Sequence, residues 1–173
     1  MDKGIYVTIE GLEGVGKTFF INKLKKGIIA IPDTDIDDTE EKIISSIRSK
    51  DMFFRDVNPI FSFLCFTAVD FHIFERVVKN NQLKNKIVVQ DRGVDTTCLY
   101  AALQMSKDDK ELIKNFKELL DIRKRIFKIP DITIVLIDDF DKCIKRAEER
   151  NGRKYSKEEI EFLRRVDKGF NLL

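Results

Sequence analysis

The chain has 173 residues, a length that suits one domain and allows roughly 70% of the unfolded surface to be buried. Its hydrophobic fraction of 43% is that of an ordinary globular protein, which argues against a disordered chain. The 32 Lys and Arg residues nearly balance the 30 Asp and Glu residues, so the net charge of +2 argues against a strongly basic nucleic-acid-binding protein. Any site for an anion must therefore be local.

Short β-branched segments alternate with longer helical patterns along the chain. Strands are expected at 5–9, 28–31, 87–89 and 132–137, and helices at about 17–26, 40–50, 58–80, 94–106, 109–128, 139–150 and 157–171. Ser156 followed by Glu159 fits a capping box that opens the last helix. This alternation predicts an α/β fold with a parallel sheet, formed by one domain over residues 1–173.

The segment 59–78 carries apolar side chains around the whole helix instead of along one stripe. Such a helix is buried on more than one side. One side is expected to face the sheet, and the other to pack either on a second subunit or under the helix at 94–106.

Two further features concern the compartment. No segment approaches 18 consecutive apolar residues, and no signal peptide is visible, so we expect a cytoplasmic protein that does not enter a membrane. Cys65, Cys98 and Cys143 are odd in number, far apart and set among apolar residues. This pattern predicts reduced buried thiols instead of disulfides or a zinc site.

A phosphate-binding loop is predicted between the first strand and the first helix. Residues 11–18 match the pattern G-x-x-x-x-G-K-[ST]. The glycines let backbone N–H groups point at phosphate oxygens, Lys17 would neutralise the β and γ phosphates, and Thr18 could hold Mg²⁺. No N-K-x-D segment for reading guanine occurs, and motors or large ATPases normally need a longer chain, so a small kinase is favoured.

Asp91 and Arg92 follow the third predicted strand, at the edge where open α/β sheets bind ligands. A carboxylate there can organise Mg²⁺, and a guanidinium can bind a phosphate with two parallel hydrogen bonds.

Together, the loop at 9–18, the helix at 63–78, Asp91-Arg92 with Thr96, Thr97 and Tyr100, and the tail at 144–170 resemble the thymidylate kinases. The resemblance covers nearly the whole chain. It implies the P-loop kinase fold, a homodimer, and transfer of the γ-phosphoryl group of ATP to a deoxynucleoside monophosphate, dTMP in the type members, with Mg²⁺. The family's sheet has five strands, of which four are expected within these residues.

The resemblance also implies roles for individual residues. Phe66 would stack on the base, Tyr100 would crowd the sugar 2′ position, Arg92 would bind the acceptor phosphate, and Glu13 would lie near the sugar and the metal. A mobile lid is expected at about 146–156, and because Gly14 stands where some members carry a catalytic arginine, a lid arginine, Arg150 or Arg153, would take that role. Arg146, Arg150 and Arg153 are spaced i, i+4, i+7, so a helix continued into the lid could present all three on one face. The complete set comprises catalytic Lys17, Glu13, Arg92, Arg150 and Arg153; ATP-binding Gly11, Gly14, Val15, Gly16, Lys17, Thr18 and Arg146; substrate-binding Phe66, Asp70, Arg92, Thr96, Thr97 and Tyr100; and metal-binding Thr18 and Asp91.

The sequence departs from the family pattern near the base. Asp70 stands where the family places an arginine that reads a thymine carbonyl, and Ala101 replaces a frequent glutamine. A carboxylate accepts hydrogen bonds and would suit an amino group. The expected arginine after the second strand is absent, so Arg48 or Arg55 could substitute for it. Kinases of another deoxynucleoside monophosphate or of a deoxynucleoside, and a nucleotide-binding protein without phosphoryl transfer, therefore remain alternatives.

Overall fold

The computed structural model describes residues 4–24, 26–33, 36–47 and 49–172. Four strands form one parallel sheet in the order β2-β3-β1-β4, namely β1 (Tyr6–Gly11), β2 (Ile28–Ile31), β3 (Ile87–Asp91) and β4 (Ile132–Leu136). The connection from β1 leads to β2 on one side, whereas that from β3 leads to β4 on the other. A crevice is expected between β1 and β3 where the connections diverge.

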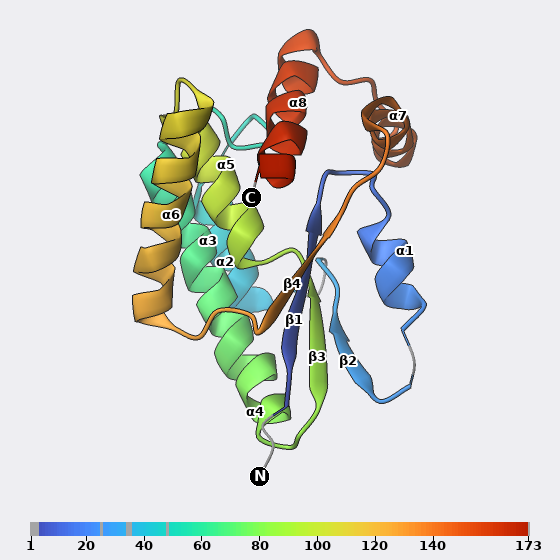
Figure 1. The fold of residues 1–173 in the computed structure, drawn as a ribbon, viewed down its shortest axis with the longest axis vertical. Coiled ribbons are helices and arrows are strands. Elements are labelled where there is room, and N and C mark those ends of the chain that lie inside the picture. The colour runs from blue at the N-terminus through green and yellow to red at the C-terminus, as the bar shows by residue number, and fades with distance from the viewer. Residues whose placement is uncertain (1–3, 25, 34–35, 48, 173) are drawn as a thin grey trace.

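Helices cover both faces of the sheet (Figure 1). They are α1 (Lys17–Asn22), α2 (Asp38–Ile47), α3 (Pro59–Ile73), the π-helical segment η1 (Phe74–Val78), α4 (Lys79–Gln82), α5 (Val94–Met105), α6 (Asp109–Ile126), α7 (Phe140–Asn151) and α8 (Lys157–Leu172). Helix α1 lies on one side of the sheet, α3, α5 and α6 lie on the other, and α7 and α8 lie above the carboxyl ends of the strands (Figure 1). The α/β fold with a four-stranded parallel sheet flanked by helices is confirmed.

Burial explains why the central strands are so apolar. All six residues of β1 are buried, because both faces of this strand are covered. Buried apolar residues of α5, α6 and α8 form the largest core cluster, which extends to the phosphate loop through Leu12 and Val15. The edge of the sheet that carries the loops is therefore anchored to packed helices.

The expected element boundaries hold to within a few residues. Helix α1 ends at Asn22 instead of at about 26, because the chain must turn before β2, and it does so through Gly27 at φ 100°. The capping box is confirmed, since Ser156 N donates to Glu159 Oε2 (2.7 Å) and Glu159 N donates to Ser156 Oγ (3.2 Å). All three cysteines are free thiols, as predicted, and Cys98 and Cys143 are buried, whereas Cys65 is only half-buried. In the described part of the chain, no helix is long and apolar enough to cross a bilayer.

Candidate active site

The phosphate loop curls between β1 and α1 through three glycines with positive φ. Gly11, Gly14 and Gly16 have φ values of 133°, 78° and 103°. A side chain at Gly14 would place its Cβ 2.0 Å from the carbonyl oxygen of Cys143 in α7, so the close approach of α7 requires glycine there. This packing explains physically why an arginine cannot occupy this position of the loop.

Lys17 lies buried under the loop. Its Nζ donates to the carbonyl oxygens of Gly11 and Leu12, at 3.0 Å each. Burial, together with the nearby charge of Arg92, lowers the pKa of Lys17 to about 8. The ammonium therefore lies in a poorly solvated site, where phosphate oxygens would add negative charge and stabilise it.

Thr18 and Asp91 provide oxygen atoms suited to a divalent cation. Thr18 Oγ1 donates to Asp91 Oδ2 (3.0 Å), whereas Asp91 Oδ1 is buried without a hydrogen-bond partner among the described residues. Burial raises the pKa of Asp91, although the nearby charge of Lys17 and the hydrogen bond from Thr18 act in the opposite direction. Because Mg²⁺ prefers hard oxygen ligands, this pair fits the predicted metal site.

Arg92 begins the turn after β3 in an unusual backbone conformation. Its φ is 63°, a left-handed value that is costly for a residue other than glycine. Arg92 N donates to Ile9 O (3.0 Å), and its guanidinium Nε lies 3.3 Å from Asp33 Oδ2. The backbone thus holds this guanidinium over the crevice between β1 and β3, where it pairs with Asp33.

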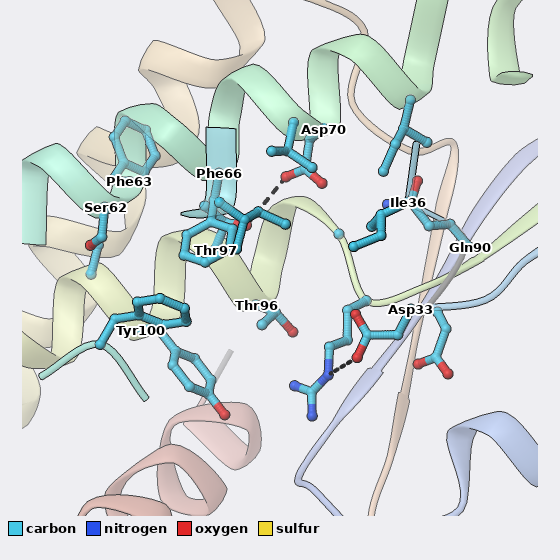
Figure 2. A pocket seen from close by; sticks show the side chains of 18 of the residues that line it. Asp33, Ile36, Ser62, Phe63, Phe66, Asp70, Gln90, Thr96, Thr97 and Tyr100 are labelled. Carbon is cyan, nitrogen blue, oxygen red and sulfur yellow. Dashed lines mark hydrogen bonds and ion pairs between the residues drawn. The ribbon is translucent and has the colours of Figure 1, made fainter. Parts of the chain in front are cut away.

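Two pockets meet at this crevice. One has a volume of about 260 Å³ and is lined by the loop with Lys17, Thr18, Arg146 and Arg150. The other has a volume of about 300 Å³ and lies between α3, α5 and the region after β2 (Figure 2). The residues common to both linings are Glu13, Asp33, Asp91 and Arg92. A group bound in one pocket could therefore react with a group bound in the other.

The second pocket contains every predicted substrate-binding residue. Phe66, Asp70, Thr96, Thr97 and Tyr100 all line it (Figure 2). Their roles toward a substrate stay predictions.

Asp70 is negatively charged where the family places a positively charged arginine. The structure shows a positive partner for Asp70 that the sequence analysis did not predict. Arg123 of α6 lies behind Asp70, and its Nη2 is 2.5 Å from Asp70 Oδ2. Helical spacing from the buried apolar residues Leu112, Phe116 and Leu119 places Arg123 on the same face of α6, which is a signal of its burial. The spacing does not indicate which carboxylate the guanidinium meets. Of the two arginines considered as substitutes after the second strand, Arg55 is bound by Asp51 (Nε to Oδ2, 2.7 Å), and Arg48 lies outside the described residues.

The lid contacts the phosphate loop through Glu13. Arg150 Nη2 donates to Glu13 Oε1 (2.5 Å), and Asn151 Nδ2 donates to the same oxygen (3.1 Å). Tyr155 OH donates to Glu13 Oε2 (2.9 Å). Burial and the charge of Glu13 raise the pKa of Tyr155, so its hydroxyl stays protonated and remains a donor. Sequence reasoning predicted Arg150 but missed Asn151 and Tyr155, which only the folding of the lid brings to Glu13.

The other two lid arginines have different partners. Arg146 pairs with Asp138 and lines the phosphate pocket. Arg153 is bound by Glu159 (Nη2 to Oε1, 2.6 Å) and lies over the Tyr155 ring. The expectation that all three arginines share one helix face is wrong, because α7 ends at Asn151 and Gly152 turns the chain at φ 68°. Arg150 is thus the lid arginine that bridges the phosphate loop directly, and the catalytic assignments stay predictions.

Glu10 is a buried carboxyl group that sequence reasoning missed. It directly precedes the loop glycine, it is fully buried, and its Oε2 accepts a hydrogen bond from Thr96, whereas Oε1 has no hydrogen-bond partner among the described residues. Burial and the nearby charge of Asp95 raise the pKa of Glu10 to about 8. The folded protein thus favours the neutral acid at this position.

This pKa predicts a pH-dependent stability. The contribution of Glu10 to the stability of the folded protein is complete below the ordinary carboxyl pKa of 4.5 and is lost as the pH rises through about 8. Replacing Glu10 with Gln should therefore raise the free energy of unfolding by about 3 kcal/mol at pH 9 and change it little at pH 5. Urea unfolding at both pH values measures this difference. Exposed Glu161→Gln is the control, and an equal effect of Glu10→Gln at both pH values would contradict a neutral Glu10.

Comparisons with known proteins agree with this geometry. A family model described as thymidylate kinase matches residues 9–173. The chain belongs to the thymidylate kinase family. Thymidylate kinase of Wolbachia pipientis subsp. Culex pipiens is 29% identical over 96% of this chain and 79% of its own length, and that of Anaplasma phagocytophilum is 30% identical over 96% and 75%. A crystal structure of thymidylate kinase from Ehrlichia chaffeensis shares the fold, with a TM-score of 0.58 at 19% identity over 99% of this chain and 100% of that one.

Family membership makes this protein an ATP-dependent nucleotide kinase of the thymidylate kinase family. The predicted family, fold class and enzyme class are thereby confirmed.

Proposed function

We propose that this thymidylate kinase family member transfers the γ-phosphoryl group of ATP to the phosphate of dTMP, giving dTDP and ADP. The single observation that carries the proposal is that the phosphate-loop pocket and the pocket lined by Phe66 and Tyr100 share Glu13, Asp91 and Arg92. A donor phosphate on the loop and an acceptor phosphate on Arg92 would meet at this junction. Positioning of this kind supplies much of the catalysis in phosphoryl transfer.

On the donor side, the loop N–H groups and Lys17 bind the β and γ phosphates of ATP. Thr18 Oγ1 and Asp91 would hold Mg²⁺, which neutralises phosphate charge when it is bound. Arg146 lies in the same pocket, where it can contact the triphosphate. Arg150 leaves Glu13 and binds the transferring phosphoryl group, where it stabilises the negative charge that spreads over the phosphoryl oxygens.

On the acceptor side, Arg92 leaves Asp33 and binds the phosphate of dTMP. The ring of Phe66 stacks on the base, and Tyr100 packs near the sugar. Thr96 donates a hydrogen bond to Glu10 and lines the same pocket. A reaction that consumes ATP and a nucleoside monophosphate suits the cytoplasm, which stays our prediction.

ADP formation from ATP and Mg²⁺ tests the activity, with dTMP, dUMP, dCMP, dGMP, dAMP and thymidine as separate acceptors. We expect dTMP to give the highest kcat/KM. A preference for another monophosphate would keep the kinase class and change the acceptor. Turnover of thymidine without turnover of dTMP would contradict the proposal, and ATP binding without any turnover would indicate a nucleotide-binding protein.

We further propose that two copies associate through α3. Ile60, Phe61, Leu64 and Phe71 of this helix are each 41–51% exposed, although they are large and apolar. A cluster of this kind on one helix marks an interaction surface, and the all-round apolar character of the helix fits burial against a second copy.

Replacing Leu64 with Lys should therefore convert a homodimer into a monomer, because a charged side chain would be buried at the centre of the contact. Light scattering coupled to gel filtration measures the mass. Leu83 is 69% exposed in the turn after α4, so Leu83→Lys is the matched control and should leave the dimer intact. A parent chain that is monomeric at micromolar concentration would contradict the proposed dimer.

A further inference from the structure

A buried arginine lies directly behind one wall of the nucleotide pocket. Arg123 is 0% exposed, its Nη1 donates to Thr67 Oγ1 (3.1 Å), and its Nη2 donates to Asp70 Oδ2 (2.5 Å). Its guanidinium lies over the Phe127 ring, 4.9 Å from the ring centre. No residue of α6 lines the pocket in the described part of the chain. Arg123 can therefore act on a bound nucleotide only through Asp70.

The two oxygens of the Asp70 carboxylate have different surroundings. Oδ2 accepts hydrogen bonds from Arg123 and from Thr97 Oγ1 (3.2 Å). Oδ1 accepts none from the residues that the structure describes. The side chain is 12% exposed and lies at the pocket wall beside Thr97 and Phe66 (Figure 2). Two donors on one oxygen fix the orientation of the carboxylate and leave Oδ1 as the acceptor for a ligand.

The pairing also removes an electrostatic conflict. A lone carboxylate in the pocket would repel a nucleotide, whose phosphate is already negative. The planar guanidinium of Arg123 compensates this charge from behind without occupying space that a base needs. What remains at the pocket wall is one acceptor oxygen, Asp70 Oδ1, in the pocket that Phe66 also lines.

We propose that Arg123 is a positioning residue that holds Asp70 so that Oδ1 accepts the N3–H of thymine, which makes Asp70 the base-reading residue of this kinase. The inference rests on the proposed function, since it assumes that dTMP is the acceptor. The proposed contact requires a base that carries an N–H donor on the edge facing Asp70 Oδ1. Loss of that donor leaves a desolvated carboxylate oxygen unpaired, which is costly.

The test compares dTMP with its 3-deaza analogue, in which a C–H group replaces N3–H and the shape is nearly unchanged. For the parent protein we expect kcat/KM to be about 10- to 100-fold higher for dTMP. In Asp70→Ala and in Arg123→Met this ratio should fall below about 3, because the acceptor is absent or no longer held. In Arg123→Met the loss for dTMP should appear mainly in KM.

The ratio separates a positioning role from a structural one, because general damage to the fold lowers kcat/KM for both substrates alike. Exposed Arg125 lies on the same helix, so Arg125→Met is the matched control and should keep the parent ratio. If Arg123→Met does not fold, the same ratio of kcat/KM values is measured in Arg123→Lys and Asp70→Ala. We expect an intermediate ratio for Arg123→Lys. A parent ratio near 1, or an unchanged ratio in the variants, overturns the inference while dTMP kinase activity stands. No turnover of dTMP overturns the proposed function and the inference together.

Discussion

Replacing Lys17 with Met should lower kcat/KM for phosphoryl transfer by on the order of 10³-fold. Nζ donates to the loop carbonyls of Gly11 and Leu12 and lies under the loop that would hold the β and γ phosphates. Without it, the charge on the transferring group loses its principal compensation in the loop. Steady-state ADP formation with dTMP measures the effect.

The stability of this variant provides the control. Burial lowers the pKa of Lys17 to about 8, which means that the folded protein disfavours the charged ammonium. Met retains the stem of the side chain, so Lys17→Met should be inactive yet at least as stable as the parent at pH 7. Lys23 is exposed at the end of α1, and Lys23→Met should keep full activity. An active Lys17→Met protein would contradict the assignment of the loop.

Replacing Arg150 with Ala should lower kcat by on the order of 10³-fold and change KM for dTMP far less. The guanidinium reaches the phosphate loop from α7 and is 58% exposed, so it can leave Glu13 for a phosphoryl group at little cost. Its contribution would arise mainly in the transition state, where charge spreads over the transferring oxygens. Steady-state kinetics with varied dTMP separates the effects on kcat and KM.

The comparison among lid residues decides this assignment. Arg153 is occupied by Glu159, so Arg153→Ala should reduce kcat much less than Arg150→Ala. Lys145→Ala, on the exposed side of the same helix, is the matched control and should change neither constant. A larger loss in kcat for Arg153→Ala than for Arg150→Ala would transfer the catalytic role to Arg153.

The strand and helix order followed from the sequence because the patterns that carry it are local. Ile87, Val88 and Val89 are a short apolar run, and a run of this kind indicates a buried strand whatever lies beside it. The helix ends were less certain, since α1 stops at Asn22 to leave room for the turn into β2. A boundary of this kind depends on where the next element must begin.

The candidate site could be predicted only in part. Lys17, Thr18, Asp91 and Arg92 belong to short motifs, and the structure brings them to one edge of the sheet because β1 and β3 are neighbours. The lid differs from the prediction. Three arginines at helical spacing were expected on one helix face, but Gly152 ends the helix before Arg153. The sequence contains that glycine in an Asn-Gly turn, and the helix predicted at 139–150 ends within one residue of α7. The expectation of a helix continued into the lid therefore conflicted with the local turn signal.

The family, the parallel α/β class and the phosphate loop could be predicted from the sequence, because the strand, helix and loop patterns are local and their order along the chain is visible in it. The contacts between distant side chains required the folded structure. In it Tyr155 and Arg150 meet Glu13, Arg123 lies behind Asp70, and Oε1 of buried Glu10 has no hydrogen-bond partner among the described residues. These contacts join residues that are far apart in the sequence. Their energy depends on burial and geometry, which no local pattern encodes.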